Sequence, residues 1–204
     1  MDRQATIDLY ASVMDEIRRR GDALNSLGSG GFAGLPSIIA AEVCYLQLRL
    51  TCELIAIACL VAHGDIEGSR TGRMQKAYEA DWTMNNLERL HPEFYPKPTK
   101  QIKDAAGKVT RTEDITTGFL TKNDLIKLYH ECASFLHRGT LKSVLSDKVR
   151  EPNFDAINRR FGQIVTLLNH HQIQLIDPDL QLWALMKGED GKSHAWIFGK
   201  APRP

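Results

Sequence analysis

The sequence has no apolar segment that resembles a signal peptide or a membrane span. Its longest uncharged apolar run, Leu54 to Ala62, holds nine residues, whereas a membrane-spanning helix needs about 20. The N-terminus opens into an amphipathic stretch and not into the apolar core of a secretory signal. We therefore expect a cytoplasmic protein with no membrane partner.

Cysteines are also few, and none is arranged to bind a metal ion. Cys44, Cys52 and Cys59 lie on one apolar stretch at spacings of eight and seven residues, and the fourth is Cys132. These spacings put three thiols on one helical face, and no CxxC pair of the kind found in zinc sites is present. We expect four buried, apolar thiols in a reducing compartment and no metal ion.

The familiar signatures of nucleotide-binding proteins and hydrolases are missing as well. The chain has no P-loop, no GxGxxG, no HExxH and no GxSxG, so we expect no cofactor. Its net charge of +1 gives no overall attraction to nucleic acid or to an anionic membrane. Any electrostatic function must therefore come from a local group of residues.

Apolar residues that recur every three or four positions predict five helices. The expected spans are residues 6–27, 36–62, 69–90, 121–139 and 154–171. The second helix is apolar nearly all round, so we expect it at the centre of a bundle. Thr121, with Asp124 three residues later, predicts the N-terminal cap of the fourth helix, and the pair His170–His171 is expected at the end of the fifth.

Two shorter regions favour strands. Residues 98–113 alternate weakly around a turn, and apolar residues after 172 alternate around the turn Gly188–Gly191. We therefore predict a mainly α fold, in which a bundle of four to five helices carries an inserted β hairpin and a small C-terminal β unit. Residues 1–171 would form the helical domain, with the hairpin at about 98–113, and residues 172–204 a small β appendage packed on it.

Charged residues form a line down the otherwise apolar second helix. Glu42, Arg49 and Glu53 fall within an arc of about 40°. Because an unpaired buried charge is strongly unfavourable, they must find partners or water, and Arg49 can pair with Glu53 four residues on. Two interpretations stay open: an ion pair that fixes how helices dock, or a polar cleft in which Arg49 presents a planar cation to an anionic ligand.

The fourth helix carries a second polar line. His130, Ser134 and His137 lie at i, i+4 and i+7 on one flank, and two histidines on a line can serve as general acid and base. They lie about 10 Å apart along the axis, too far for both to bind one metal ion. Arg138 sits off this flank near the helix end. The alternative is a pair of boundary histidines bonded to nearby carbonyls.

The predicted hairpin is locally basic. Only Asp104 opposes its cations, which are Lys97, Lys100, Lys103, Lys108 and Arg111. This excess favours either contacts with phosphates or a solvated, lysine-rich surface.

Two segments together carry a family resemblance. Glu42 to Ile55, followed far downstream by Leu128 to Gly139, resembles bacterial helical-bundle proteins of the HEPN type over about half the chain. Catalytic members of that family are metal-independent endoribonucleases that act as dimers, and they carry an arginine, four to six intervening residues and then a histidine on one helix. The nearest match here has His130 in the arginine position, followed after six residues by His137.

The resemblance implies a HEPN-like homodimer that binds or cleaves RNA. His137 would be the general acid or base, with His130 assisting it. The substrate-binding residues would be Arg49, Arg138, Glu53 and Ser134. The alternative is a non-catalytic helical module that recruits a protein partner through its hairpins.

Overall fold

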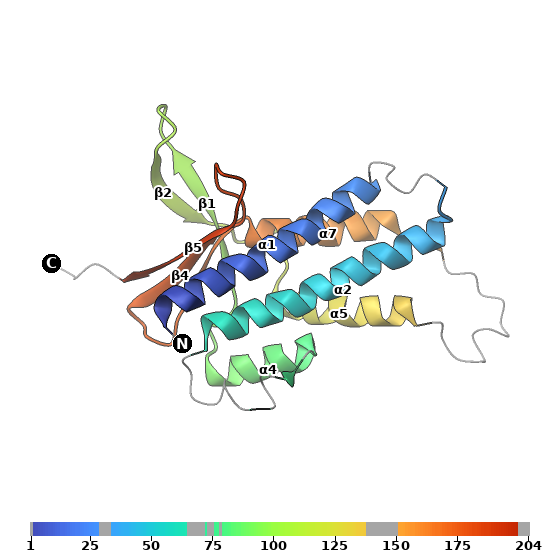
Figure 1. Cartoon of the computed structure of the whole chain (residues 1–204), viewed down its shortest axis with the longest axis horizontal. Helices are drawn as coiled ribbons and strands as arrows, with labels where there is room; N and C mark the ends of the chain where they lie inside the picture. The colour runs from blue at the N-terminus through green and yellow to red at the C-terminus, as the bar shows by residue number, and fades with distance from the viewer. Residues whose placement is uncertain are drawn as a thin grey trace.

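The structure, a computed structural model, describes residues 2–28, 34–64, 72, 76–77, 79–137 and 151–199 of the chain. The helices within these residues are α1 (Arg3–Gly28), α2 (Ser37–Ala62), α4 (Ala80–Leu90), α5 (Lys122–Leu136) and α7 (Phe154–Leu168). The strands within them are β1 (Lys97–Lys103), β2 (Val109–Asp114), β3 (His170–Gln174), β4 (Leu180–Leu185) and β5 (His194–Gly199). The helices run alongside one another, and the sheet lies toward one end of them (Figure 1).

The prediction of a mainly α fold with a small β unit is wrong, because the chain has a mixed α+β fold. Of the described residues, 56% are helical and 18% belong to one antiparallel sheet, whose strand order is β2-β1-β3-β4-β5. The predicted hairpin forms as β1 and β2, but β1 also pairs with β3 through Lys97↔Gln172 and Pro98↔His171. Alternation within a segment shows which residues share a face and not which distant strand lies beside it, so the sequence does not show that two β signals far apart in the chain belong to one sheet.

One face of the sheet packs against α1. Residues at alternate positions of the last three strands turn toward this face and are buried, as their alternation predicts: Ile173, Leu182, Ala184 and Ala195. His171 is buried on the same face. The Tyr10 hydroxyl of α1 lies 2.6 Å from Nε2 of His171. On the other side of that ring, Nδ1 lies 3.0 Å from the carbonyl oxygen of Leu168. Burial lowers the pKa of His171 to about 4, so the ring is neutral, Nδ1 donates to the carbonyl and Tyr10 donates to Nε2.

The structure also corrects the helix that was expected over residues 154–171. The helix ends at Leu168, and His170 and His171 belong to β3, so their expected place at a helix end is wrong. Both side chains are buried in the sheet layers instead.

Helix α2 lies at the centre of the bundle as predicted, since α1, α4, α5 and α7 all contact it. Its buried side chains include three cysteines, and all four cysteines of the chain are buried and free, in agreement with their prediction as apolar residues. By length and composition, α2 is the one described helix that could also cross a membrane. However, 44% of its most apolar window is buried inside the fold, and the core helix of a soluble protein passes the same test.

The ends of the other helices follow local signals. Thr121 caps α5, and its Oγ1 accepts a hydrogen bond from the backbone N–H of Asp124 at 3.1 Å, as predicted. The helix ends at Leu136 with His137 as its C-cap, and the expected C-terminal Gly139 lies outside the described residues. The helix predicted over residues 69–90 is confirmed only in its second half, because α4 begins at Ala80 with Glu79 as its extended N-cap; most of the residues before Glu79 lie outside the description.

Candidate functional site

The polar residues predicted on α2 and α5 meet around the side chain of Arg49. Its Nε lies 3.3 Å from Oε1 of Glu53, so the pair that the i, i+4 spacing allows is present. Its Nη2 donates to the hydroxyl oxygen of Tyr129 at 2.8 Å, and its Cζ lies 4.2 Å from the centre of the tyrosine ring. Arg49 therefore joins α2 to α5 by a hydrogen bond and a cation–π contact. Burial raises the pKa of Tyr129 even though Arg49 opposes the shift, so the phenol keeps its proton near neutral pH.

His130 lies beside this contact and faces a carboxylate from a third helix. The rings of Tyr129 and His130 have their centroids 5.8 Å apart. Nε2 of His130 lies 3.2 Å from Oδ2 of Asp81 in the first turn of α4. The other carboxylate oxygen accepts the backbone N–H of Trp82 at 2.8 Å, which holds Asp81 in position.

We call Arg49, Glu53, Asp81, Tyr129 and His130 the α2–α4–α5 cluster. The three helices contact one another in pairs, so the cluster stands on packed elements. Apart from Tyr129, its members remain accessible: the side chain of His130 is 60% exposed and that of Arg49 is 25% exposed. The predicted residues Arg49, Glu53 and His130 are thus brought together.

The rest of the predicted histidine line continues along α5, away from the cluster. Ser134 and His137 are exposed and follow His130 about one and two turns further on. As the C-cap, His137 has a near-helical φ of −76°, which keeps its side chain close to the helical line, while its ψ of 132° turns the chain away. Arg138 lies outside the described residues.

The cluster holds the groups that acid–base chemistry on an anionic substrate requires. A carboxylate that bonds one imidazole nitrogen orients the ring and leaves the other nitrogen free to take or give a proton. A guanidinium beside it binds phosphate or carboxylate oxygens. Thiol chemistry does not fit the site, because burial raises the pKa of the neighbouring Cys132 to about 12. Among the described residues, no group of three or more His, Cys, Asp or Glu side chains is placed to hold a metal ion.

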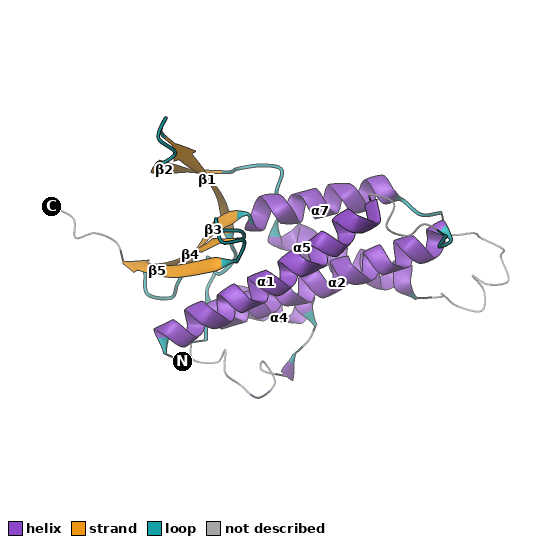
Figure 2. Ribbon diagram, turned by 45° about the horizontal axis from the view of Figure 1, so that its top comes forward, coloured by secondary structure: helices purple, strands orange, loops and turns teal. Residues whose placement is uncertain are grey.

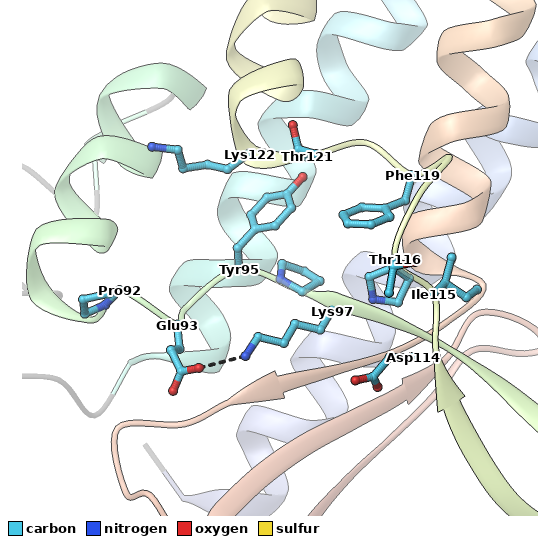
Figure 3. A pocket seen from close by; sticks show the side chains of 12 residues that line it. Pro92, Glu93, Tyr95, Lys97, Asp114, Ile115, Thr116, Phe119, Thr121 and Lys122 are labelled. Atoms are coloured by element: carbon cyan, nitrogen blue, oxygen red, sulfur yellow. Dashed lines mark hydrogen bonds and ion pairs between the residues drawn. The ribbon is translucent and has the colours of Figure 1, made fainter.

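A hollow lies elsewhere, between the end of α4, the start of β1 and the segment before α5. It has a volume of about 540 Å³, and Tyr95 and Phe119 line it together with several prolines (Figure 3). Two of its polar groups are already engaged within the protein. Lys97 Nζ donates to Glu93 at 2.8 Å, and the Tyr95 hydroxyl donates to the carbonyl of Leu120 at 2.9 Å. The α2–α4–α5 cluster, with its exposed imidazole, is therefore the better candidate for chemistry.

Two members of the cluster were missed in the sequence. Tyr129 lies on the apolar face of α5, where a core residue is expected, and it is only 5% exposed. Asp81 reads as an ordinary acidic residue in the first turn of a helix. Neither position carries a local signal, because both contacts depend on how α2, α4 and α5 dock.

In comparisons with known proteins, no family model, curated protein or solved structure matches the chain significantly. The candidate site is therefore argued from its geometry alone.

Proposed function

We propose that this protein is a HEPN-like, metal-independent endoribonuclease that acts in the cytoplasm. The observation that carries the proposal is the position of Arg49, whose guanidinium lies against Tyr129, next to the His130–Asp81 pair. The HEPN pattern on α5 has a histidine where an arginine is expected. Arg49 supplies an arginine to the same region from α2.

The proposed reaction needs only groups of this kind. His130, oriented by Asp81, accepts the proton of a ribose 2′-hydroxyl, and the oxygen attacks the adjacent phosphorus. Arg49 binds the non-bridging phosphate oxygens and stabilises the charge that develops on them. The bond from phosphorus to the 5′-oxygen breaks, and a second acid returns a proton to that oxygen. The products are a 2′,3′-cyclic phosphate and a free 5′-hydroxyl.

His137 is the proposed acid, and its distance from His130 favours a dimer. The two residues lie about 10 Å apart along one helix, too far to serve the same phosphate from one chain. A two-fold axis passing near Ser134, midway between them, would place His130 opposite His137 of the partner subunit. Ser134 is small and exposed, so two copies of α5 can approach closely there. The free, buried cysteines support a reducing, cytoplasmic location.

The test is cleavage of a mixed RNA pool in EDTA. We expect wild type to cleave, and His130→Ala and Arg49→Ala to lose at least about 100-fold in rate, the usual contribution of a general acid or base. Lys127→Gln is the matched control, because it removes an exposed charge from the same helix three residues before His130. The control should retain activity, and all variants should retain the wild-type circular dichroism spectrum.

Two further variants separate the parts of the proposal. Glu53 competes with phosphate for Arg49 at 3.3 Å, so Glu53→Gln should lower KM for RNA. Ser134→Arg places a bulky cation on the proposed two-fold axis and should give an inactive monomer by light scattering, whereas the exposed Asn123→Arg should not. Absence of cleavage by wild type, or full activity in His130→Ala, would show that the cluster is not catalytic, and a protein-interaction role would then be tested by affinity purification.

A further inference from the structure

The two faces of the sheet differ in what they present. Residues on the inner face pack against α1, as described above. The outer face of β4 and β5 instead carries three aromatic side chains, namely Trp183, Trp196 and Phe198. Figure 2 shows the strands set to one side of the helices, with β5 at the free edge of the sheet.

These three aromatic residues form one continuous patch. Trp183 and Trp196 are direct cross-strand partners, and Phe198 follows Trp196 by two residues, so it shares the same face. Trp196 is 41% exposed and Phe198 is 53% exposed. Trp183 is half-buried, and its Nε1 donates to Oε1 of Gln181 at 3.2 Å, which holds the ring in place. Large aromatic side chains gathered on an exposed face mark an interaction site far more often than isolated ones do.

A basic cleft adjoins the aromatic patch. It has a volume of about 410 Å³ and lies between β1, β3 and the end of α7. Its lining includes Lys100, Lys103 and His170, and no aspartate or glutamate. Within the described part of the chain, neither lysine forms an ion pair. The ring of His170 lies 5.5 Å from that of Trp183 by centroids, so the cleft and the patch touch.

We propose that the cleft and the aromatic patch together bind single-stranded RNA. Unpaired bases stack on the rings of Trp196 and Phe198, and phosphates lie at Lys100 and Lys103. Every base has an apolar face that an exposed indole or phenyl ring can cover. The positive, acid-free lining of the cleft complements a phosphate backbone and not an apolar protein surface. The choice of RNA rests on the proposed function, and single strands are required because bases in a duplex are already stacked.

Binding is measured by fluorescence anisotropy with labelled oligouridylate in EDTA, using the full chain carrying His130→Ala so that cleavage does not interfere. Trp196→Ala and Phe198→Ala should each weaken binding about tenfold, the effect of losing one stacked base. Ile39→Ala is the matched control, since Ile39 is 40% exposed near the start of α2. Trp196→Tyr retains a ring and should retain most of the affinity, which separates stacking from misfolding.

Substitution of the lysines should instead change how strongly RNA binding depends on salt. Lys100→Gln and Lys103→Gln should each lower the slope of log Kd against log salt by about 0.7, the value for one phosphate contact in a single strand. Arg89→Gln removes an exposed cation from α4 and should leave the slope unchanged. Duplex RNA of the same length should bind more weakly than the single strand.

Failure of this proposal can be told apart from failure of the catalytic one. Weakened binding in Trp196→Ala supports the RNA surface even where wild type shows no cleavage. Equal affinity in Trp196→Ala, Phe198→Ala and the parent overturns it. Absence of RNA binding by the parent also overturns it. If these substitutions then change only self-association, a second protein covers the patch.

Discussion

Acidification should destabilise the protein through two buried histidines. His63 is 1% exposed and His171 is fully buried. Burial lowers the pKa of each ring from 6.5 to about 4. Both rings are therefore neutral in the folded protein, and each is held by a hydrogen bond: Nε2 of His63 donates to the carbonyl of Phe94 at 3.1 Å, and His171 donates to Leu168.

The sign of the effect follows from where the protons bind. Between pH 6.5 and about 4, the unfolded chain binds protons at these two residues and the folded chain does not. The stability that they contribute is present above pH 6.5 and is lost as the pH falls toward 4. Each histidine removes about 1.4 kcal/mol per pH unit, or roughly 3 kcal/mol over the window. Two such losses are a large part of the 5–15 kcal/mol that is typical of a folded domain.

Urea denaturation followed by tryptophan fluorescence, at intervals from pH 7 to pH 4.5, measures the slope. His63→Gln keeps a donor for the Phe94 carbonyl and removes one titrating group, so it should lower the slope, while His171 and His170, whose pKa values burial also lowers, still titrate. Lys127→Gln changes the exposed surface of α5 without removing a histidine and should leave the slope as it is. A free energy of unfolding that stays constant from pH 6.5 to pH 5 in wild type would refute the reasoning.

Two other predictions concern local contacts. Thr121→Ala removes the side-chain oxygen that caps α5 and should lower the free energy of unfolding by about 1 kcal/mol, whereas Asn123→Ala in the exposed first turn should have a smaller effect in the same urea titration. The four cysteines should react with a thiol reagent such as DTNB only after unfolding, because they are buried and burial raises the pKa of Cys52, Cys59 and Cys132; rapid reaction of the native protein would contradict this.

Local sequence signals predicted the elements of this fold well. The three- and four-residue periodicity located α1 and α2 nearly to their ends, and the Thr121 cap located the start of α5. Alternation of Ile173, Leu182 and Ala195 identified the strands and the face that they bury. Each of these signals depends on residues within a few positions of one another, so a single sequence contains it.

Contacts between distant segments could not be predicted in this way. The pairing of Lys97 with Gln172 joins the hairpin to the C-terminal strands and changes the fold class. The hydrogen bond from Arg49 to Tyr129 spans 80 residues, and Asp81 reaches His130 only because α4 packs on α5. The candidate site was therefore predicted in part, from its charged residues, and its tyrosine and aspartate became visible only with the helix packing.

The charges of the two proposed sites explain why one chain would carry both. Arg49 is paired with Glu53, and Asp81 adds a second carboxylate beside His130, so the α2–α4–α5 cluster does not attract a polyanion by itself. The cleft beside the sheet has the opposite character, with Lys100 and Lys103 and no acidic residue in its lining. Affinity for RNA would then come from the sheet and bond cleavage from the helices. Substitutions on the sheet should raise KM with little change in kcat, whereas substitution of His130 should lower kcat and leave RNA binding intact.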